Sequence, residues 1–446
     1  FNSMKTIFNT NADGTSINSA KRLLSISSKT EYNNMLKKAI TIIGNQKHEV
    51  EYSDVDPWLG SFRNSTSRLA DGTYQVDIRI PAYEKYSSMR SKVLNPSNRN
   101  MLTQEAMMVS SITKQVDANG DPTNLKTINA NITTWNNAWN YRDYSGNETS
   151  PTVDAEKIWR RHKSYIWKDQ IDPVTGSYST NVNEINNYFD WGLGQPTNTK
   201  WQEVSEITRY NHWSLPIETK DINNNYVSTR MGNNESKAIA GGNARLTEMF
   251  YSGAEYLSNE SSSYFDSEIK SFGRTIEKAH TGDYSVKVGV NQKAFEVNLK
   301  NGEHRADKYK ISVWVDKLTA SNARIHINGS TKLFNGETVH AGDWVLLNHY
   351  EDLSSGVENI YFTSSSGNVY FDDFRLLPIF SSMNCYVYNS WDELTHIIGS
   401  NGLATMYEYD EAGRLFKTYN EIEDDGTPEG IGGFKLNSRT DYNYKN

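Results

Sequence analysis

A short motif repeated near the C-terminal end of the chain constrains the fold more than any other feature. The motif reads Tyr-Asp-Glu-Ala-Gly-Arg-Leu at residues 409–415, and a degenerate copy, Tyr-Asn-Ser-Trp-Asp-Glu-Leu, begins at Tyr388. Asp410 can bond backbone groups of a turn, Gly413 supplies a positive φ, and Leu415 starts the next strand. The repeat therefore predicts β-hairpin corners, although an ordinary pair of hairpins would give the same pattern.

The motif resembles the tyrosine-aspartate (YD, or Rhs) repeat of very large secreted or surface-displayed proteins, and Tyr210-Asn211 resembles a third, divergent unit. The layout of the chain resembles the C-terminal part of large Rhs-like surface proteins of Bacteroidota, which commonly carry a jelly roll before their last repeats. This resemblance implies an extracellular or cell-surface protein exported by the type IX route. The start at Phe1 leads us to expect a part of a longer protein.

Composition narrows the class of protein. Lys and Arg number 46 against 54 Asp and Glu, giving a net charge of −8, and no basic block is present, which argues against a nucleic-acid partner. No apolar run approaches 18 residues, so no transmembrane segment is predicted. The 27 Tyr and 11 Trp, with a mean hydropathy of −0.71, favour partly solvated β-structure. The single cysteine, Cys385, excludes an internal disulfide and is interpreted as a small buried residue.

Residues 1–249 contain a turn-forming motif that occurs twice. Residues 56–62 and 172–178 share the form Asp-Pro-x-x-Gly-Ser-aromatic, which predicts the same strand-to-strand turn twice. Residues 73–80 alternate apolar and polar side chains and predict a strand. Residues 30–55 combine helical spacing with β-branched runs and are predicted to be mainly β, whereas 104–108 is ambiguous between helix and strand.

Residues 250–380 predict an antiparallel sandwich. Six or more short segments alternate with a period of two, and turns such as Asn328-Gly329 separate them. Three signatures, at 280–285, 342–344 and 370–376, resemble the galactose-binding-like jelly roll of carbohydrate-binding modules. The fold class is therefore predicted to be all-β: a YD/Rhs-like antiparallel sheet with an inserted or adjoining jelly roll and few short helices.

Three regions are expected: a YD/Rhs-like β-rich region at 1–249, the sandwich at 250–380 and C-terminal YD hairpins at 381–446. The last segment, 432–446, alternates like a strand. An unpaired terminal strand invites aggregation, so we expect it to pair with the hairpin around Tyr409.

The resemblance to carbohydrate-binding modules implies a structural calcium ion in the jelly roll. Carried over to this chain, it nominates Asp372 and, less directly, Glu255 as ligands. Calcium takes six to eight oxygen ligands, which carboxylates and loop carbonyls could supply. The alternative is that Asp372 and Asp373 cap turns or pair with Arg375.

Glycan binding would require exposed aromatic rings that stack on sugar faces. In alternating strands any single aromatic is more often a core residue than a binding platform. The candidate stacking residues are Tyr309, Trp314, Trp344, Tyr350 and Tyr361.

The sequence carries no recognisable catalytic motif. Nucleophile elbow, P-loop, dinucleotide-binding and His-Glu-x-x-His patterns are absent, and the nine histidines are scattered. Residues 117–121 imitate an EF-hand start, but residue 128 is Ile where Glu is expected, so a hairpin turn is predicted.

The chain is therefore predicted to be a non-enzymatic scaffold or adhesin whose jelly roll binds a glycan or a protein partner. An outer-membrane secretion or display complex is a plausible partner by resemblance only. The alternatives are a fragment of an Rhs-type toxin shell and an accessory binding module of a larger polysaccharide-degrading enzyme.

Overall fold

The computed structural model describes residues 2–5, 25–28, 35–44, 46–180, 182–256, 264–265, 268–424 and 433–442. The chain divides into two compact units, residues 1–78 with 110–125 and residues 79–109 with 126–446. The described structure is all-β apart from the short helices α1 (Ala82–Lys85) and α2 (Val182–Asn187) and a few single 3-10 turns. The predicted fold class is confirmed.

The first unit is built on an antiparallel meander. Its strands are β3 (Lys38–Ile43), β4 (Gln46–Val55), β5 (Phe62–Arg68) and β6 (Tyr74–Pro81), each paired with the next. Two short hairpins accompany it: β1 (Asn2–Lys5) with β2 (Ser25–Ser28), and β8 (Gln115–Val116) with β9 (Pro122–Thr123). The strand predictions are confirmed for 73–80 and for the described residues of 30–55, since β-branching and alternation outweigh the helical spacing; residues 30–34 and 45 lie outside the described part of the chain.

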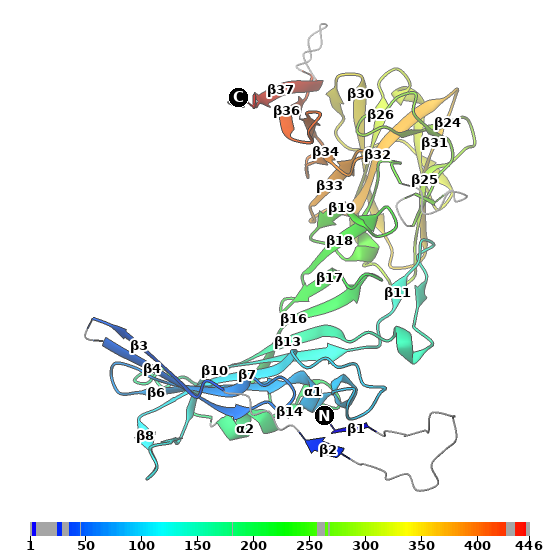
Figure 1. The fold of residues 1–446 in the computed structure, drawn as a ribbon. Coiled ribbons are helices and arrows are strands. Elements are labelled where there is room, and N and C mark those ends of the chain that lie inside the picture. Colours follow the sequence, from blue (N-terminus) through cyan, green and yellow to red (C-terminus); the bar gives the residue numbers. More distant parts are fainter. Residues whose placement is uncertain are drawn as a thin grey trace, which may run out of the picture. The chain divides into compact units, whose positions relative to one another are not determined.

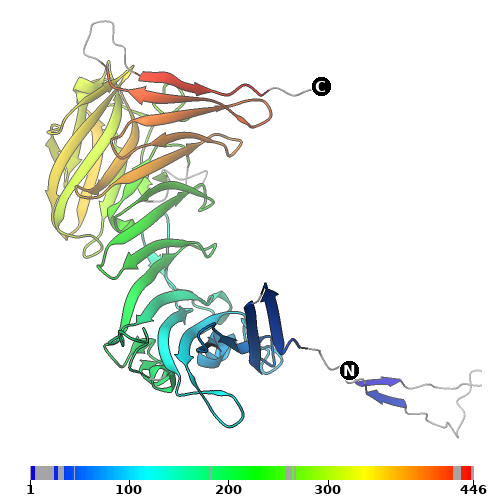
Figure 2. The same cartoon turned by 90° about the vertical axis from the view of Figure 1, so that its left-hand side faces the viewer.

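The second unit contains a longer meander (Figures 1 and 2). Its strands pair antiparallel in the order β10 (Lys126–Asn136), β13 (Arg160–Trp167), β16 (Trp201–Tyr210), β17 (Pro216–Asp221), β18 (Tyr226–Gly232), β19 (Lys237–Gly242), β33 (Met383–Tyr388), β34 (Leu394–Ile398), β35 (Ala404–Tyr409), β36 (Leu415–Ile422) and β37 (Gly433–Arg439). The ambiguous stretch 104–108 lies at the start of strand β7 (Glu105–Thr113). Strand β37 pairs with β36, which confirms the predicted partner of the terminal strand.

A two-sheet sandwich is inserted between the neighbouring strands β19 and β33. One sheet has the order β23 (Arg274–Thr275), β24 (Ser285–Val288), β32 (Val369–Pro378), β26 (Asp307–Asp316), β30 (Trp344–Leu353) and β29 (Val339–Ala341), with β20 (Phe250–Ser252) also paired to β32. The other has the order β21 (Tyr264–Phe265), β22 (Ile269–Lys270), β25 (Ala294–Leu299), β31 (Glu358–Ser364), β27 (Ala323–Ile327) and β28 (Ser330–Lys332). Two small hairpins lie outside these sheets: β11 (Tyr141–Arg142) with β12 (Glu148–Thr149), and β14 (Phe189–Asp190) with β15 (Gln195–Pro196).

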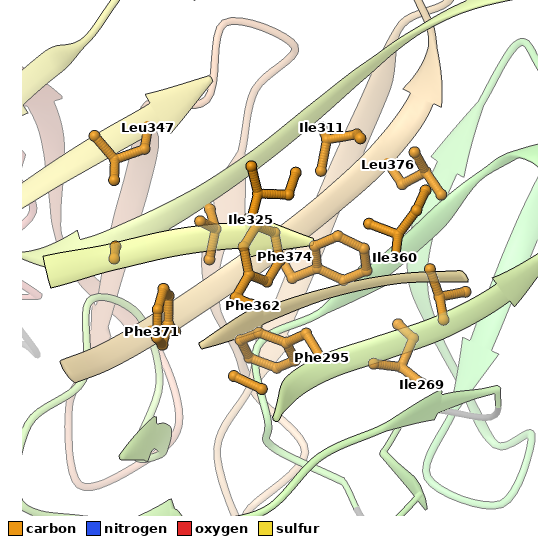
Figure 3. Packing of buried hydrophobic residues seen from close by; sticks show 14 of the residues in the cluster. Ile269, Phe295, Ile311, Ile325, Leu347, Ile360, Phe362, Phe371, Phe374 and Leu376 are labelled. Atoms are coloured by element: carbon orange, nitrogen blue, oxygen red, sulfur yellow. The ribbon is translucent and has the colours of Figure 1, made fainter. Parts of the chain in front are cut away.

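The core of the sandwich lies between its sheets (Figure 3). Phe362 contacts Phe371 and Phe374 with ring centroids 5.7 and 5.5 Å apart, and Phe295 stacks on Phe374 at 5.7 Å. Aliphatic side chains such as Ile325 and Leu376 fill the remaining space. Burial of each large apolar side chain stabilises the fold by about 1.5–3 kcal/mol, so this cluster is a substantial source of stability.

At six places in the described part of the chain, hairpin corners share one geometry. The first residue accepts through Oδ1 the backbone N–H groups of the residues two and four positions later, at 2.8–3.0 Å. The fourth residue has a positive φ, 72° at Gly413, as a type I turn with a left-handed bulge residue requires. These corners begin at Asp117, Asp143, Asn211, Asp221, Asn389 and Asp410. The predicted corners at 211, 389 and 410 and the hairpin turn predicted at 117–121 are confirmed.

The two Asp-Pro corners also adopt one shared conformation. Asp56 Oδ1 accepts the N–H groups of the residues two and three positions later at 2.9 and 3.1 Å, and Asp172 Oδ1 does so at 2.8 and 3.2 Å. Gly60 and Gly176 follow with φ of 66° and 70°. The predicted repeated turn is confirmed, although the second corner connects only a bridge between Ile171 and Tyr178.

Candidate functional site

Three of the predicted glycan-stacking residues are core residues. Tyr309 and Trp314 are 0% exposed, and Trp344 is 8% exposed. Trp314 donates its indole N–H to the carbonyl oxygen of Gly402 at 3.1 Å. The prediction that these rings stack on a surface glycan is wrong: Tyr309 belongs to the core between the two sheets, whereas Trp314 and Trp344 form a separate buried cluster against which Leu403 packs.

Tyr350 and Tyr361 remain partly exposed. Tyr361 lies on β31, where its ring stacks on His326 at 4.6 Å and Lys293 Nζ lies 4.1 Å from the ring centroid. The backbone N–H of Tyr350 donates to Asn335 Oδ1 at 2.7 Å, beside the sheet edge formed by β29. Tyr350 and Tyr361 are therefore the two predicted stacking residues that remain partly accessible on the sandwich.

The predicted calcium ligands Asp372 and Glu255 both bond to the backbone of the loop between β23 and β24. Asp372 Oδ2 accepts the backbone N–H of His280 at 2.7 Å, and Glu255 Oε1 accepts the N–H groups of Asp283 and Tyr284, both at 3.0 Å. Burial and the charge of Asp373 raise the pKa of Asp372 well above its ordinary value. Both carboxylates therefore act as loop anchors here.

The donor chemistry at this loop suits calcium in kind, since carboxylate and carbonyl oxygens are its preferred ligands. Within the described ranges, however, no group of three or more His, Cys, Asp or Glu side chains has a geometry that could hold a metal ion. Calcium at Asp372 and Glu255 stays a prediction.

A buried ionic cluster centres on His280. Its Nδ1 lies 2.7 Å from Asp373 Oδ2 and its Nε2 lies 2.7 Å from Glu421 Oε1, and each of the three side chains is at most 1% exposed. The imidazole faces a carboxylate at both nitrogens, and only the protonated ring can donate to both. Trp314 stacks on the imidazole with ring centroids 4.0 Å apart. We call these four residues the histidine cluster.

The surroundings of the histidine cluster satisfy its remaining acceptors. Tyr251 and Thr281 donate their hydroxyls to Asp373, both at 2.9 Å, and Glu421 Oε2 accepts the N–H of Ala404 at 2.8 Å. Burial alone would lower the pKa of His280, but Glu421 and Asp373 raise it to about 10. Because Glu421 lies on β36 and His280 lies in the sandwich, the cluster joins the sandwich to the C-terminal hairpins.

Arg375 bonds backbone carbonyl groups and not the carboxylates of Asp372 and Asp373, which were its predicted alternative partners. Its guanidinium donates to the carbonyl oxygens of Gly399 at 3.0 Å, Met383 at 2.9 Å and Ser400 at 3.4 Å. The alternative in which Asp372 and Asp373 pair with Arg375 is wrong, because Asp372 instead accepts the backbone N–H of His280, and Asp373 bonds Tyr251, His280 and Thr281. Arg375 instead ties β32 to strands of the C-terminal hairpins.

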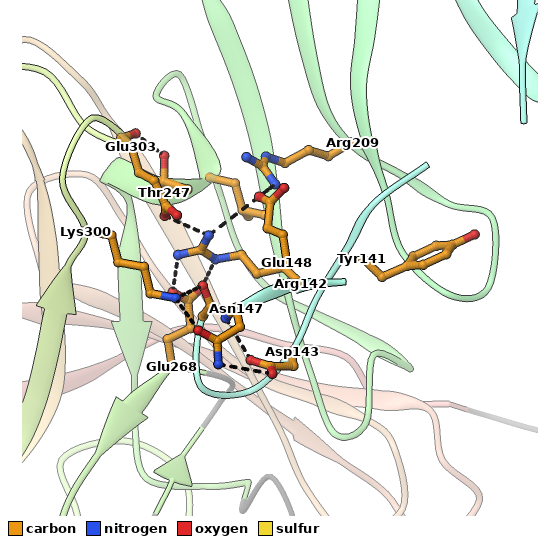
Figure 4. Close-up of polar contacts among 12 residues, drawn as sticks. Tyr141, Arg142, Asp143, Asn147, Glu148, Arg209, Thr247, Glu268, Lys300 and Glu303 are labelled. Carbon is orange, nitrogen blue, oxygen red and sulfur yellow. Dashed lines mark hydrogen bonds and ion pairs between the residues drawn. The ribbon is translucent and has the colours of Figure 1, made fainter. Parts of the chain in front are cut away.

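A second buried cluster lies at the other flank of the sandwich (Figure 4). Arg142 on β11 donates to Glu268 Oε1 at 2.9 Å and Oε2 at 2.7 Å, and it pairs with Glu303 at 2.7 Å. Arg230 on β18 pairs with the same Glu268 at 3.1 Å. We call Arg142, Arg230, Glu268 and Glu303 the arginine cluster.

Three of the four charges in the arginine cluster are nearly excluded from water, whereas the Glu303 side chain is 28% exposed. The side chains of Arg142, Arg230 and Glu268 are at most 6% exposed. Burial would raise the pKa of Glu268, but the two arginines lower it below its ordinary value. Glu268 and Glu303 belong to the sandwich, so this cluster joins the sandwich to β11 and β18.

The sequence contains little that predicts the histidine cluster or the arginine cluster. His280 opens the signature at 280–285, yet a histidine near a strand resembles any surface histidine in sequence. Arg142, Glu268 and Glu421 have no local signal, because their partners lie from 38 to 141 positions away along the chain. Cys385 is buried as predicted, and burial raises its pKa to about 12.

The comparisons with known proteins give no close relative. No protein-family model matches the chain, and no curated protein matches it. A crystal structure of TcdB2-TccC3 is 11% identical, with 89% of this chain and 26% of that chain covered and a TM-score of 0.17. An exo-beta-1,3-galactanase from Phanerochaete chrysosporium is 10% identical, with 84% and 99% covered and a TM-score of 0.19. A Photorhabdus luminescens Tc holotoxin pore is 9% identical, with 95% and 18% covered and a TM-score of 0.19.

The chain spans about a quarter of the length of the TcdB2-TccC3 chain that it matches. Likeness at these TM-scores supports no statement about function. Among the described helices, none combines the length and the apolar character needed to cross a membrane.

Proposed function

We propose that this chain is part of a non-enzymatic, exported protein of the cell surface or the extracellular space. In this proposal the meander of the second unit is a scaffold, and the sandwich is a carbohydrate-binding-module-like jelly roll that presents a binding face for a glycan or a protein partner. The observation that carries the proposal is the attachment of the sandwich by buried ion pairs at both flanks.

The attachment supports a scaffold because buried charges tolerate little displacement. Removing one partner from a buried pair costs about 3–5 kcal/mol, so sliding the sandwich away from Glu421 or Arg142 would leave uncompensated charge. The strands β19 and β33 that flank the insertion are themselves hydrogen-bonded neighbours. A sandwich held in this way keeps a fixed position on the meander of the second unit, as a display module requires.

Surface location is tested in cells that produce the full-length gene product. We expect externally added protease and an antibody against this chain to reach it on intact cells. Retention of the chain inside intact cells, with access only after lysis, would overturn the proposal of an exported protein. A cytoplasmic marker protein serves as the control for lysis.

Ligand binding by the sandwich is tested with Tyr361→Ala in the whole chain. On an array of oligosaccharides and on isolated cell-envelope proteins, we expect the wild type to bind a ligand and Tyr361→Ala to bind it more weakly. Tyr309→Phe is the matched control, because Tyr309 is buried and its ring is retained. Equal binding by wild type and Tyr361→Ala would move the ligand site away from this face.

The main alternative is a fragment of an Rhs-type toxin shell, which the uninterrupted antiparallel meander of the second unit also favours. A shell requires that the full-length protein enclose another polypeptide. Limited proteolysis separates the two functions, since a shell protects an internal fragment from digestion and a scaffold or an accessory module of an enzyme does not.

A further inference from the structure

A groove in the second unit lies apart from the sandwich and both ionic clusters. It has a volume of about 570 Å³ and is bordered by the segment after α1, strands β10 and β13, and the β14–β15 hairpin. Its lining includes the aromatic residues Tyr86, Trp135, Trp159 and Trp191. The volume falls in the range of about 300–1,000 Å³ that is typical of small-molecule sites.

The aromatic rings of the groove are held in place by the protein itself. Trp159 donates its indole N–H to Ser88 Oγ and Trp135 donates its own to the carbonyl oxygen of Glu105, both at 3.0 Å. The hydroxyl of Tyr86 accepts the backbone N–H of Trp135 at 3.1 Å. These bonds fix the polar edges of Tyr86, Trp135 and Trp159, so binding to these three rings would cost little side-chain ordering.

Ring packing adds to this fixed arrangement. Tyr86 lies 5.2 Å from Trp159 and 6.4 Å from Trp191, the latter at an interplanar angle of 85°. The tryptophans pack against a buried group that includes Tyr83 and Met89, yet each retains partial exposure. The groove therefore presents partly exposed aromatic rings in different orientations, and a buried apolar cluster supports them.

The polar lining of the groove consists of donors more than acceptors. The side-chain oxygen of Asn136 accepts the backbone N–H of Ala138 at 3.0 Å. The side-chain N–H groups of Asn136 take no part in that bond. Lys85 Nζ lies 5.1 Å from the ring centroid of Trp191, and burial lowers the pKa of Lys85. Gln195 is an exposed part of the lining, and no Asp or Glu belongs to it.

We propose that this groove binds a pyranose unit of an oligosaccharide, neutral or carrying a carboxylate. Sugar C–H faces match partly exposed aromatic rings, and sugar hydroxyl or carboxylate oxygens match the amide and ammonium donors beside them. An apolar ligand would displace water from the amide groups of Asn136 and Gln195 without replacing its hydrogen bonds. The proposal goes beyond the function proposed above, because it places a second binding site in the sheet itself.

The test titrates the whole chain with neutral and uronate-containing hexasaccharides and follows tryptophan fluorescence and calorimetric heat. We expect at least one hexasaccharide to bind and to lose affinity about tenfold or more with Trp159→Ala, as for an aromatic anchor. Gln195→Ala changes an exposed side chain and keeps the fold, and we expect a smaller loss of a few-fold. Trp391→Ala is the matched control, because Trp391 is 83% exposed and lies outside the groove, and it leaves this binding unchanged.

Three results would overturn the proposal: no hexasaccharide binds, Trp159→Ala and Gln195→Ala both bind as the wild type does, or the groove takes up peptides and no saccharide. If Trp159→Ala fails to fold, Gln195→Ala and the protection of the groove from hydrogen exchange by the bound hexasaccharide decide the outcome. A protein found inside cells that still binds sugar in the groove would contradict the proposed function and leave this inference standing.

Discussion

His280 in the sandwich and Glu421 on β36 are joined by a buried contact of 2.7 Å between Nε2 and Oε1, although they are 141 positions apart in sequence. Asp373 Oδ2 lies 2.7 Å from the other ring nitrogen of His280, Nδ1. The pair connects the inserted sandwich to hairpins that follow it in the chain. The stability of the C-terminal hairpins should therefore depend on the charge of one imidazole.

The first prediction is that Glu421→Gln destabilises the protein by about 3 kcal/mol, because it removes one partner of a buried ion pair while keeping the size of the side chain. Chemical denaturation measures the free energy of unfolding, and hydrogen exchange should rise first in β33 to β37. Glu423→Gln, at an exposed neighbouring position, is the control. A change below about 0.5 kcal/mol in Glu421→Gln would contradict a buried ionic link.

The second prediction concerns pH. The pKa of His280 is raised to about 10 from its ordinary value of 6.5, so its protonated form is favoured by folding. The contribution is fully present below pH 6.5 and is lost as the pH rises towards 10. We expect the difference in free energy of unfolding between wild type and His280→Gln to be constant below pH 6.5 and to shrink above it. A difference that stays flat from pH 6.5 to 10 would show that His280 is neutral in the fold.

The third prediction tests the hairpin corners. Gly413 has a φ of 72°, so Gly413→Ala should destabilise the protein by about 1 kcal/mol through strain in the left-handed region. Asp392 occupies the equivalent place in the degenerate copy with a φ of 68°, and Asp392→Gly should be neutral or stabilising by up to about 1 kcal/mol. The Asp392 carboxylate is 74% exposed, so its ion pair with Lys237 adds little. Melting temperatures measure both changes, and equal effects of the same sign would contradict this explanation.

The fourth prediction concerns calcium at Asp372 and Glu255. If the ion binds the folded state only, EDTA lowers the melting temperature and added calcium restores it, since a ligand at 100 times its Kd stabilises by about 2.7 kcal/mol. Asp372→Asn should abolish the response to calcium. Magnesium is the control, because it accepts such irregular oxygen sites poorly. A melting temperature that neither EDTA nor calcium changes would exclude the site.

Local features of the fold could be predicted from the sequence with good accuracy. The corner at Asp410 depends only on residues within five positions, and the alternation of residues 73–80 defines a strand without reference to any partner. The short-range chemistry of Asp-Pro and Gly also identified both copies of the turn at Asp56 and Asp172. These signals are strong because hydrogen bonds within a turn and the period of a strand are local properties.

The candidate sites were less predictable. Tyr309 and Trp314 were predicted as possible stacking residues but are buried, because which face of a strand is covered depends on distant parts of the chain. The groove around Trp159 draws on residues from Lys85 to Gln195, and no motif links them. Burial and long-range pairing cannot be read from spacing when the partners come from separate strands.

The sequence by itself determined an all-β chain with a repeated hairpin corner, because φ preferences, side-chain capping and two-residue alternation act over a few positions. Tertiary structure alone decided that His280 lies between Asp373 and Glu421, and that Arg142 and Arg230 share Glu268. It also decided that one groove is lined by Tyr86, Trp135, Trp159, Tyr165 and Trp191. Those arrangements arise from packing of distant strands, where exclusion of water makes a charge costly to leave unpaired.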